Sequence, residues 1–286
     1  MVFTLDGRWF WNSRGLQGKA VEFIMNYEGR SLPEAVNILT NGHPQSAPLP
    51  PPPHNTSQEK KPFKLPEKSP TFKRLFAYLC NTRKLDPEIV QELVAQHRIY
   101  ESIHRYLVPS TGELREAHNV VFVGLDAQGK PRSAYQRGTN TNAITPYKRD
   151  VAGSDKSYGF ICPGRTGVNE VSVFEASIDA ISHATLEKIS GGDWRARDRI
   201  VLGGVSSLAL IRYLQEHPQI CQIQLCLDCD GPGLTAAEKL THELAKAGYH
   251  DVTISPPPMG KDWNDYLVAF RRVLNQTEGK ELSDAQ

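Results

Sequence analysis

The pattern of apolar and polar residues changes near residue 170. Beyond that point, short apolar runs alternate with segments whose apolar residues recur at helical spacing. The runs lie near residues 171–175, 199–204, 223–228 and 252–256, and the helical segments near 178–190, 206–216 and 233–247. Strands that alternate with helices in this way predict right-handed crossovers and a mainly parallel sheet with helices on both faces. We therefore predict an α/β domain over residues 168–272, with its ligand site beyond the carboxyl ends of the strands.

The preceding stretch, residues 67–167, predicts a smaller α+β domain. Two helices are expected to begin at Ser69-Pro70 and Asp86-Pro87, because each pair is a capping residue followed by proline. Two β-rich runs flank the turn sequence DAQG at residues 126–129, which predicts a hairpin. A basic, loop-rich stretch, YKRDVAGSDKSYGF, follows the hairpin.

The two ends of the chain predict simpler structures. Residues 1–42 are expected to form a small unit, with a strand and turn at WFWNSRG and two helices, the first closed by Gly29 and the second capped by Ser31. Proline, serine and polar residues dominate residues 43–66, which predicts a semi-rigid linker. Residues 273–286 are expected to be a polar tail.

Composition narrows the class of protein. Hydrophobic residues make up 39% and charged residues 23%, as in ordinary globular proteins, and no apolar run is long enough to cross a bilayer. The first residues lack a basic segment followed by an apolar one, so we expect a cytoplasmic protein with no membrane partner. Five scattered cysteines, an odd number, predict reduced thiols.

Charge is distributed unevenly along the chain. Residues 59–165 hold 18 Lys and Arg against 11 Asp and Glu, whereas residues 166–286 hold 11 against 17. A basic middle beside an acidic end suits a nucleic-acid groove next to a metal site. Ordinary solvated surface charge is the alternative explanation for either half alone.

The ends of the predicted strands carry the candidate chemistry. Glu175 ends the first run, Gly203 and Gly204 end the second, and Asp228 and Asp230 end the third. Side chains alternate along a strand, so Asp228 and Asp230 should point to the same side. Converging carboxylates without local Lys or Arg partners predict either a hard divalent cation or a retained proton. Mg²⁺ is the expected ion, with Mn²⁺ as a substitute; the alternative is that these acids only cap helices or turns.

Two neighbouring motifs extend this constellation. The glycine-flanked turn in DCDGPG offers backbone amides to phosphate oxygens, and GKDWNDYL adds Lys261, Asp262 and Asp265. Cys226 and Cys229 form a C-x-x-C sequence, but on a strand they face opposite sides and no second pair exists. We therefore expect no zinc site and no redox role for them.

The motifs VFEASIDAIS, LGGVS, CLDCDGPG and GKDWNDYL, in this order, resemble the Toprim domain of bacterial primases, topoisomerases and some nucleases. The resemblance covers about residues 168–270. It implies a Mg²⁺-dependent phosphoryl-transfer site in which Glu175, Asp228 and Asp230 are catalytic and bind the metal. Asp179 and Asp262 match further acidic positions of the primase branch. Asn264 stands where that branch has another acid.

Upstream segments resemble other parts of primase-like proteins. Residues 67–167 resemble the domain of uncertain function that often precedes Toprim in mobile-element proteins, and they are analogous to the basic N-terminal part of a primase core. The first 42 residues are similar to the end of the primase zinc-binding domain. Trp11 and Arg14 stand at its cysteine positions, which implies a degenerate remnant that holds no zinc.

The resemblance implies a primase-like nucleotidyltransferase that acts on single-stranded DNA with nucleoside triphosphates, in plasmid or mobile-element replication or transfer. In that role Glu175 is a metal ligand or a general base or acid. Candidate phosphate-binding residues are Arg137, Lys148, Arg149, Lys156, Gly203, Gly204 and Lys261. Two alternatives remain open: a Toprim nuclease, and a non-catalytic nucleic-acid-binding accessory protein beside a helicase or relaxase.

Overall fold

The computed structural model of the 286-residue chain describes residues 2–3, 7, 9–11, 16–40, 62–108, 111–143, 145–203 and 207–284. It divides into two compact units, residues 1–59 and 60–286. Most of the predicted linker, and Gly204 of the candidate site, lie outside the described residues. No helix in the described ranges is long and apolar enough to cross a membrane.

The first unit contains a small antiparallel sheet and two helices. The sheet has strands β1 (Val2–Phe3), β2 (Trp9–Trp11) and β3 (Leu16–Gly18), and the helices are α1 (Ala20–Glu28) and α2 (Leu32–Leu39). Trp9 is buried, and its indole Nε1 donates to the Lys19 carbonyl at 2.9 Å. Gly29 ends α1 in the left-handed conformation, with φ of 67°, as the sequence predicted.

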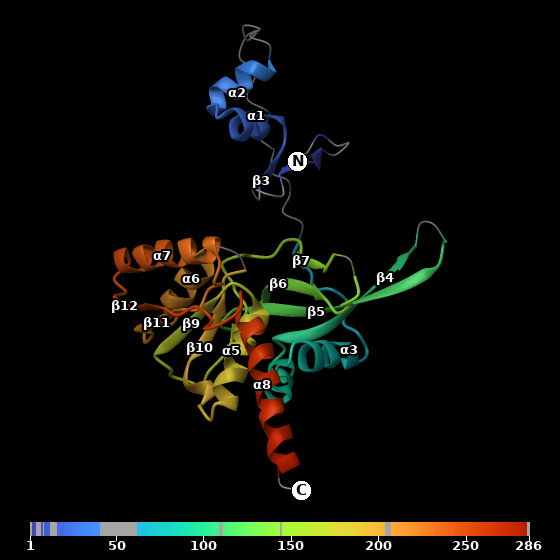
Figure 1. Cartoon of the computed structure of the whole chain (residues 1–286). Helices are drawn as coiled ribbons and strands as arrows, with labels where there is room; N and C mark the ends of the chain where they lie inside the picture. Colours follow the sequence, from blue (N-terminus) through green and yellow to red (C-terminus); the bar gives the residue numbers. More distant parts are fainter. Residues whose placement is uncertain are drawn as a thin grey trace. The chain divides into compact units, whose positions relative to one another are not determined.

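The second unit begins with a four-stranded antiparallel sheet in the order β4-β5-β6-β7. Its strands are β4 (Ile99–Leu107), β5 (Leu114–Leu125), β6 (Pro131–Gly138) and β7 (Lys148–Asp150). The hairpin predicted around residues 126–129 is confirmed as β5 and β6. The sequence did not predict β4, which pairs with β5 in a long projecting hairpin (Figure 1).

Three helical segments precede this sheet. They are α3 (Lys73–Phe76), the π-helix η2 (Ala77–Thr82) and α4 (Pro87–Ala95). Asp86 caps α4, because its side chain accepts from the Glu88 and Ile89 amides. The prediction that Ser69 caps a helix is wrong. The Ser69 amide donates to the Glu101 carbonyl, so this segment pairs with β4 and the helix begins only at Lys73.

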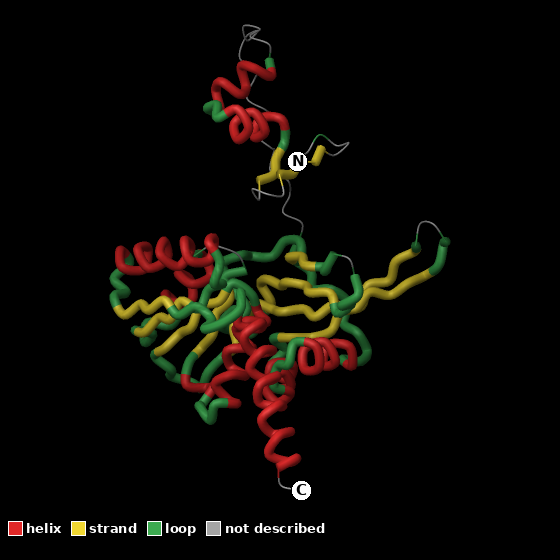
Figure 2. The backbone as a smooth tube through the Cα atoms, in the orientation of Figure 1, coloured by secondary structure: helices red, strands yellow, loops and turns green. Residues whose placement is uncertain are grey.

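The second sheet of this unit has the order β12-β11-β9-β10-β8. Its strands are β8 (Ile161–Cys162), β9 (Glu170–Phe174), β10 (Asp198–Val201), β11 (Gln222–Leu225) and β12 (Asp251–Ile254). All neighbours are parallel except β8 and β10. The predicted mainly parallel α/β sheet is therefore confirmed, and the two sheets lie side by side (Figure 2).

Helices cover the parallel sheet through two hydrophobic cores. The helices are α5 (Ser177–Ile189), α6 (Leu208–Glu216), α7 (Gly231–Lys246) and α8 (Trp263–Asp284), with a short 3-10 turn, η3 (Trp194–Ala196). Residues of α6 and α7 pack in one core, whereas α5 and α8 share the other with α4 and β5. That shared core joins the two sheets. Helix α8 continues through the predicted start of the polar tail at residue 273.

Candidate active site

The carboxylates of the candidate site meet where β9 and β11 end. Glu175 follows β9 directly, and Asp228 lies in the loop after β11. The Asp228 amide donates to Glu175 Oε1 at 3.3 Å. A Cβ atom at Gly233 would lie 2.2 Å from the Asp228 carbonyl oxygen and 3.0 Å from Glu175 Oε1, so only glycine fits here.

Asp230 is linked to Asp228 through a lysine. Its Oδ1 accepts from the Gly233 amide at 2.9 Å and so caps α7, which is the alternative role considered for this acid. Lys261 Nζ lies 3.1 Å from Asp230 Oδ2 and 3.7 Å from Asp228 Oδ2. The expectation that the carboxylates lack a local basic partner is therefore wrong. A backbone hydrogen bond of 2.8 Å from Cys229 N to Lys261 O brings this later segment to the cluster.

Crowding changes the proton affinity of these acids. Burial first, then repulsion from Glu175 and Asp262, raises the pKa of Asp228 to about 6. Burial, followed by Asp262 and Asp228, raises the pKa of Asp179 well above its usual value. The Gly233 amide and then Lys261 lower the pKa of Asp230. The surroundings of Asp228 and Asp179 therefore disfavour the charged forms of these two acids, whereas the surroundings of Asp230 favour its charged form.

Asn264 connects this cluster to the helices of the first sheet. Its backbone amide donates to Asp179 Oδ1 at 3.1 Å, and its Nδ2 donates to the Arg83 carbonyl at 2.8 Å and to Ser182 Oγ at 3.0 Å. Arg83 Nη1 in turn donates to Asn264 Oδ1 at 3.2 Å. Asn264 is only 3% exposed, so this residue serves as a buried strut.

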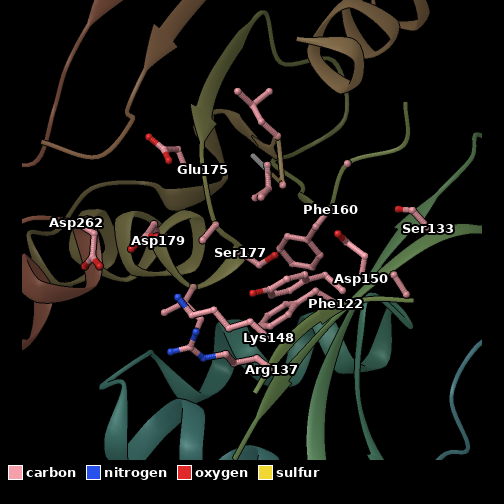
Figure 3. A pocket seen from close by; sticks show the side chains of 18 of the residues that line it. Phe122, Ser133, Arg137, Lys148, Asp150, Phe160, Glu175, Ser177, Asp179 and Asp262 are labelled. Carbon is pink, nitrogen blue, oxygen red and sulfur yellow. The ribbon is translucent and has the colours of Figure 1, made fainter. Parts of the chain in front are cut away.

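A cavity of about 370 Å³ separates the carboxylates from a set of basic residues. We call Glu175, Asp179, Asp228 and Asp262 the acidic wall, and Arg83, Arg137, Lys148 and Lys156 the basic wall. In Figure 3 the side chains of Arg137 and Lys148 extend into the cavity toward the side that carries Asp179. Phe122 and Phe160 line another part of the cavity, and their rings pack edge to face with 5.3 Å between the ring centroids.

The basic wall combines residues distant in sequence. Tyr78 in η2 holds two of them, because its hydroxyl accepts from Arg83 Nε at 3.0 Å and from Arg137 Nε at 3.2 Å. Lys156 is paired with Asp150. Across the described ranges, Arg83, Arg137 and Lys148 make no ion pair. They remain available to an anionic ligand.

The other predicted phosphate-binding residues are placed differently. Arg149 follows Lys148 on β7, so its side chain points to the opposite side of the strand. There it lines a second groove of about 1250 Å³, which we call the wide groove. Gly203 lines the cavity with a φ of 66°. Lys261 also lines the cavity but is bound to Asp230.

The donor atoms of the acidic wall suit a hard cation. All are carboxylate oxygens, the ligands that Mg²⁺ prefers, and Asp228 and Asp230 already share the ammonium group of Lys261. However, the described residues contain no group of three Asp, Glu, His or Cys side chains placed to hold a metal ion. The carboxylate oxygens thus suit Mg²⁺ by their chemistry, and in this structure Asp228 and Asp230 hold the ammonium group of Lys261.

Sequence reasoning did not select Tyr78 or Arg83. Both lie in the segment FKRLFAYLCNTRK, where they resemble ordinary residues of an amphipathic helix. The sequence marked this region in one way. The helical pattern of the segment ends near Thr82-Arg83-Lys84, shortly before the helix that Asp86 caps.

Comparison with known proteins agrees with the motifs of this site. Residues 172–267 match the family described as Toprim-like, and residues 77–164 match a family described as a protein of unknown function (DUF3991). The chain contains a Toprim-like domain. This domain supplies the acidic wall, and the DUF3991 region, which ends at residue 164, supplies the basic wall. Both resemblances are thereby confirmed, whereas the zinc-domain remnant at residues 1–42 stays a prediction.

Individual relatives are distant. An uncharacterized protein of Bacillus anthracis is 24% identical over 307 residues, covering 96% of this chain and 79% of that protein. The primase fragment of the bacteriophage T7 primase-helicase protein is 17% identical, with a TM-score of 0.46 over 69% of this chain and 72% of that chain. A DNA primase domain from Pseudomonas aeruginosa is 18% identical, with a TM-score of 0.46 over 72% of each chain.

Proposed function

We propose that this chain is a primase-like enzyme, which transfers a nucleotidyl group from a nucleoside triphosphate to a nucleic-acid 3′ end. The observation that carries the proposal is the cavity of about 370 Å³ with carboxylates on one wall and, on the other, Arg83, Arg137 and Lys148, which make no ion pair among the described residues. A triphosphate with a divalent cation complements both walls at once, because the cation suits the carboxylates and the phosphates suit the arginines and lysines.

Each wall receives a defined task in this proposal. Asp228, Asp230 and Glu175 would hold Mg²⁺, joined by Asp179 and Asp262, and Lys261 would move from the carboxylates to a phosphate. Mg²⁺ would supply neutralisation of the charge on the triphosphate oxygens. Arg83, Arg137 and Lys148 would orient the triphosphate. The 3′ hydroxyl would lose its proton to Glu175 or to water as its oxygen bonds to the α-phosphorus and the bond to pyrophosphate breaks.

In this proposal the wide groove holds a single strand of DNA. Arg74 and Tyr78 line it from α3 and η2, Tyr106 from β4, and Tyr147 and Arg149 from the segment at β7. Cations interleaved with aromatic rings suit a flexible polyanion whose bases can stack. Following the resemblance of the upstream domain, we place the reaction in plasmid or mobile-element replication or transfer, beside a helicase or relaxase.

The test is Mg²⁺-dependent primer synthesis on single-stranded DNA by the full chain. Replacing Asp228 and Asp230 together by asparagine should lower the rate by roughly a thousandfold, because several kcal/mol of charge stabilisation is lost. The matched control is Asp251→Asn with Glu238→Gln, which removes two exposed carboxylates away from the cavity and should leave the rate unchanged. Equal rates in the first variant and the unaltered protein would exclude the proposal.

One observation favours a second candidate, a non-catalytic nucleic-acid-binding protein. Lys261 lies between Asp228 and Asp230, and the described residues lack a ready group of three metal ligands. In that case the chain should bind DNA equally well with and without chelator and show no turnover. The same incubations with labelled DNA also detect a Toprim nuclease, which would cleave the DNA without added nucleotides.

A further inference from the structure

A third cavity, which the proposed reaction does not use, lies between helix α8 and the segment around η2 and α4. We call it the α8 cavity. Its volume is about 410 Å³, and it is lined by residues 80–82, 84–85 and 87 on one side and by residues of α8 on the other. Three of the lining residues are cations: Lys84, Arg271 and Arg272. None of the described residues that line it is Asp or Glu, so the three cations line the cavity without a carboxylate among them.

The three cations are also unpaired elsewhere. Over the described stretches of the chain, none of them makes an ion pair, and Arg271 Nε is buried without a hydrogen-bond partner. Lys188, which also faces α4, instead binds Asp86 and Glu88. Lys84 and Arg272 are exposed and Arg271 is half-buried, so their mutual repulsion is weakened by water, whereas the unpaired buried Nε of Arg271 costs stability. An anionic ligand in the α8 cavity would offset the remaining repulsion and give this donor a partner.

Lys84 lines this cavity from a turn with an unusual backbone conformation. Its φ of 62° is in the left-handed region, which a lysine rarely adopts. Arg83, one residue earlier, lines the cavity between the acidic and basic walls, whereas Lys84 lines the α8 cavity. The turn after η2 therefore sends two consecutive cations to two different cavities.

The neighbouring groove indicates which anion the α8 cavity takes. Asn81 and Thr82 line both the wide groove and the α8 cavity, so the two are adjacent across the last turn of η2. A strand that follows the groove over this turn would bring its next phosphates to Lys84, Arg271 and Arg272. We propose that the α8 cavity binds phosphodiester groups of a nucleic-acid strand beyond the wide groove. This inference rests on the nucleic-acid partner of the proposed function, but not on catalysis.

The experiment measures binding of a labelled single-stranded DNA oligonucleotide to the full chain, in chelator, over a series of salt concentrations. The variant is Lys84→Asn with Arg272→Gln; asparagine is chosen because it tolerates the left-handed conformation. We expect about tenfold weaker binding, and a log–log salt slope that is flatter by about 1.4, since each phosphate contact on a single strand contributes about 0.7. Lys130→Gln with Lys246→Gln is the control, because it removes the same charge from exposed positions outside the described cavities and should leave the slope unchanged.

A second arm separates a strand from a free phosphate compound. Tripolyphosphate is titrated into the unaltered protein and the variant by calorimetry, and thermal unfolding of both proteins verifies that the variant folds. An unchanged oligonucleotide slope in the folded variant overturns the inference. Loss of tripolyphosphate binding alone, with the slope unchanged, would assign the cavity to free phosphates and also overturn it. A flatter slope in a protein that makes no primers would retain the inference while the enzymatic proposal fails.

Discussion

The acidic and basic walls face the same cavity, but the chain builds them in different ways. The acidic wall comes from the ends of neighbouring parallel strands and the starts of helices, held by short backbone contacts such as Asp228 N to Glu175 Oε1. The basic wall comes from strands β6 and β7, the loop after β7 and the turn after η2, and its residues are held by side-chain contacts such as those of Arg83 and Arg137 with the Tyr78 hydroxyl. A substitution in the acidic wall should therefore disturb the fold, and one in the basic wall should chiefly change ligand binding.

The strut between the two walls should give the largest effect. Asn264→Asp keeps the size of the side chain, but it removes the donors to the Arg83 carbonyl and Ser182 Oγ and adds a buried carboxylate near Asp179. We expect a loss of about 3 to 5 kcal/mol in the free energy of unfolding, measured with urea. Gln276→Glu, an exposed position on the same helix that lines none of the described cavities, should change it by less than about 0.5 kcal/mol. Equal stability of the two variants would show that Asn264 is no strut.

A pair of glycines tests how tightly the acidic wall is built. Gly233→Ala places a Cβ 2.2 Å from the Asp228 carbonyl oxygen, so the loop after β11 must move. We expect a loss of about 2 kcal/mol, as for other overpacked sites, measured by the same unfolding. Gly231→Ala has open space around its new Cβ and should be within about 0.5 kcal/mol of the unaltered protein. If both alanines were tolerated alike, the close packing of this wall would not matter to stability.

The sequence predicted the acidic side of the site better than the basic side. Parallel strands end at one edge, so the strand pattern predicted that Glu175 and Asp228 meet. The prediction that Asp228 and Asp230 end the strand itself is wrong, because β11 ends at Leu225 and Asp230 caps α7. Lys261 was assigned to phosphate, because no local pattern shows that the segment after β12 returns to Asp230. The contact between Lys261 and Asp230 depends on how the loop after β12 packs against the loop after β11, and the spacing of residues in the sequence does not predict that packing.

The basic side depended on long-range packing that residue patterns do not contain. Arg83 and Arg137 are held by one tyrosine hydroxyl, although 54 residues separate them in the sequence. The Ser69-Pro70 start was wrong because pairing with β4, itself not predicted, outweighed the local capping preference. The π-helix that positions Tyr78 has no sequence signature in this chain.

The smallest expected effects come from two neighbours on β7, and they concern ligands rather than the fold. Lys148 lines the cavity between the walls, and Arg149 lines the wide groove. Both are exposed, so replacing either by glutamine should leave stability nearly unchanged. Lys148→Gln should weaken binding of a labelled nucleoside triphosphate by about fivefold and leave oligonucleotide binding intact, whereas Arg149→Gln should do the reverse. Fluorescence anisotropy with both ligands measures this. If both variants weakened binding of the same ligand, the alternation of side chains along β7 would not separate two binding sites. The nucleotide and the DNA strand would then bind at one shared site.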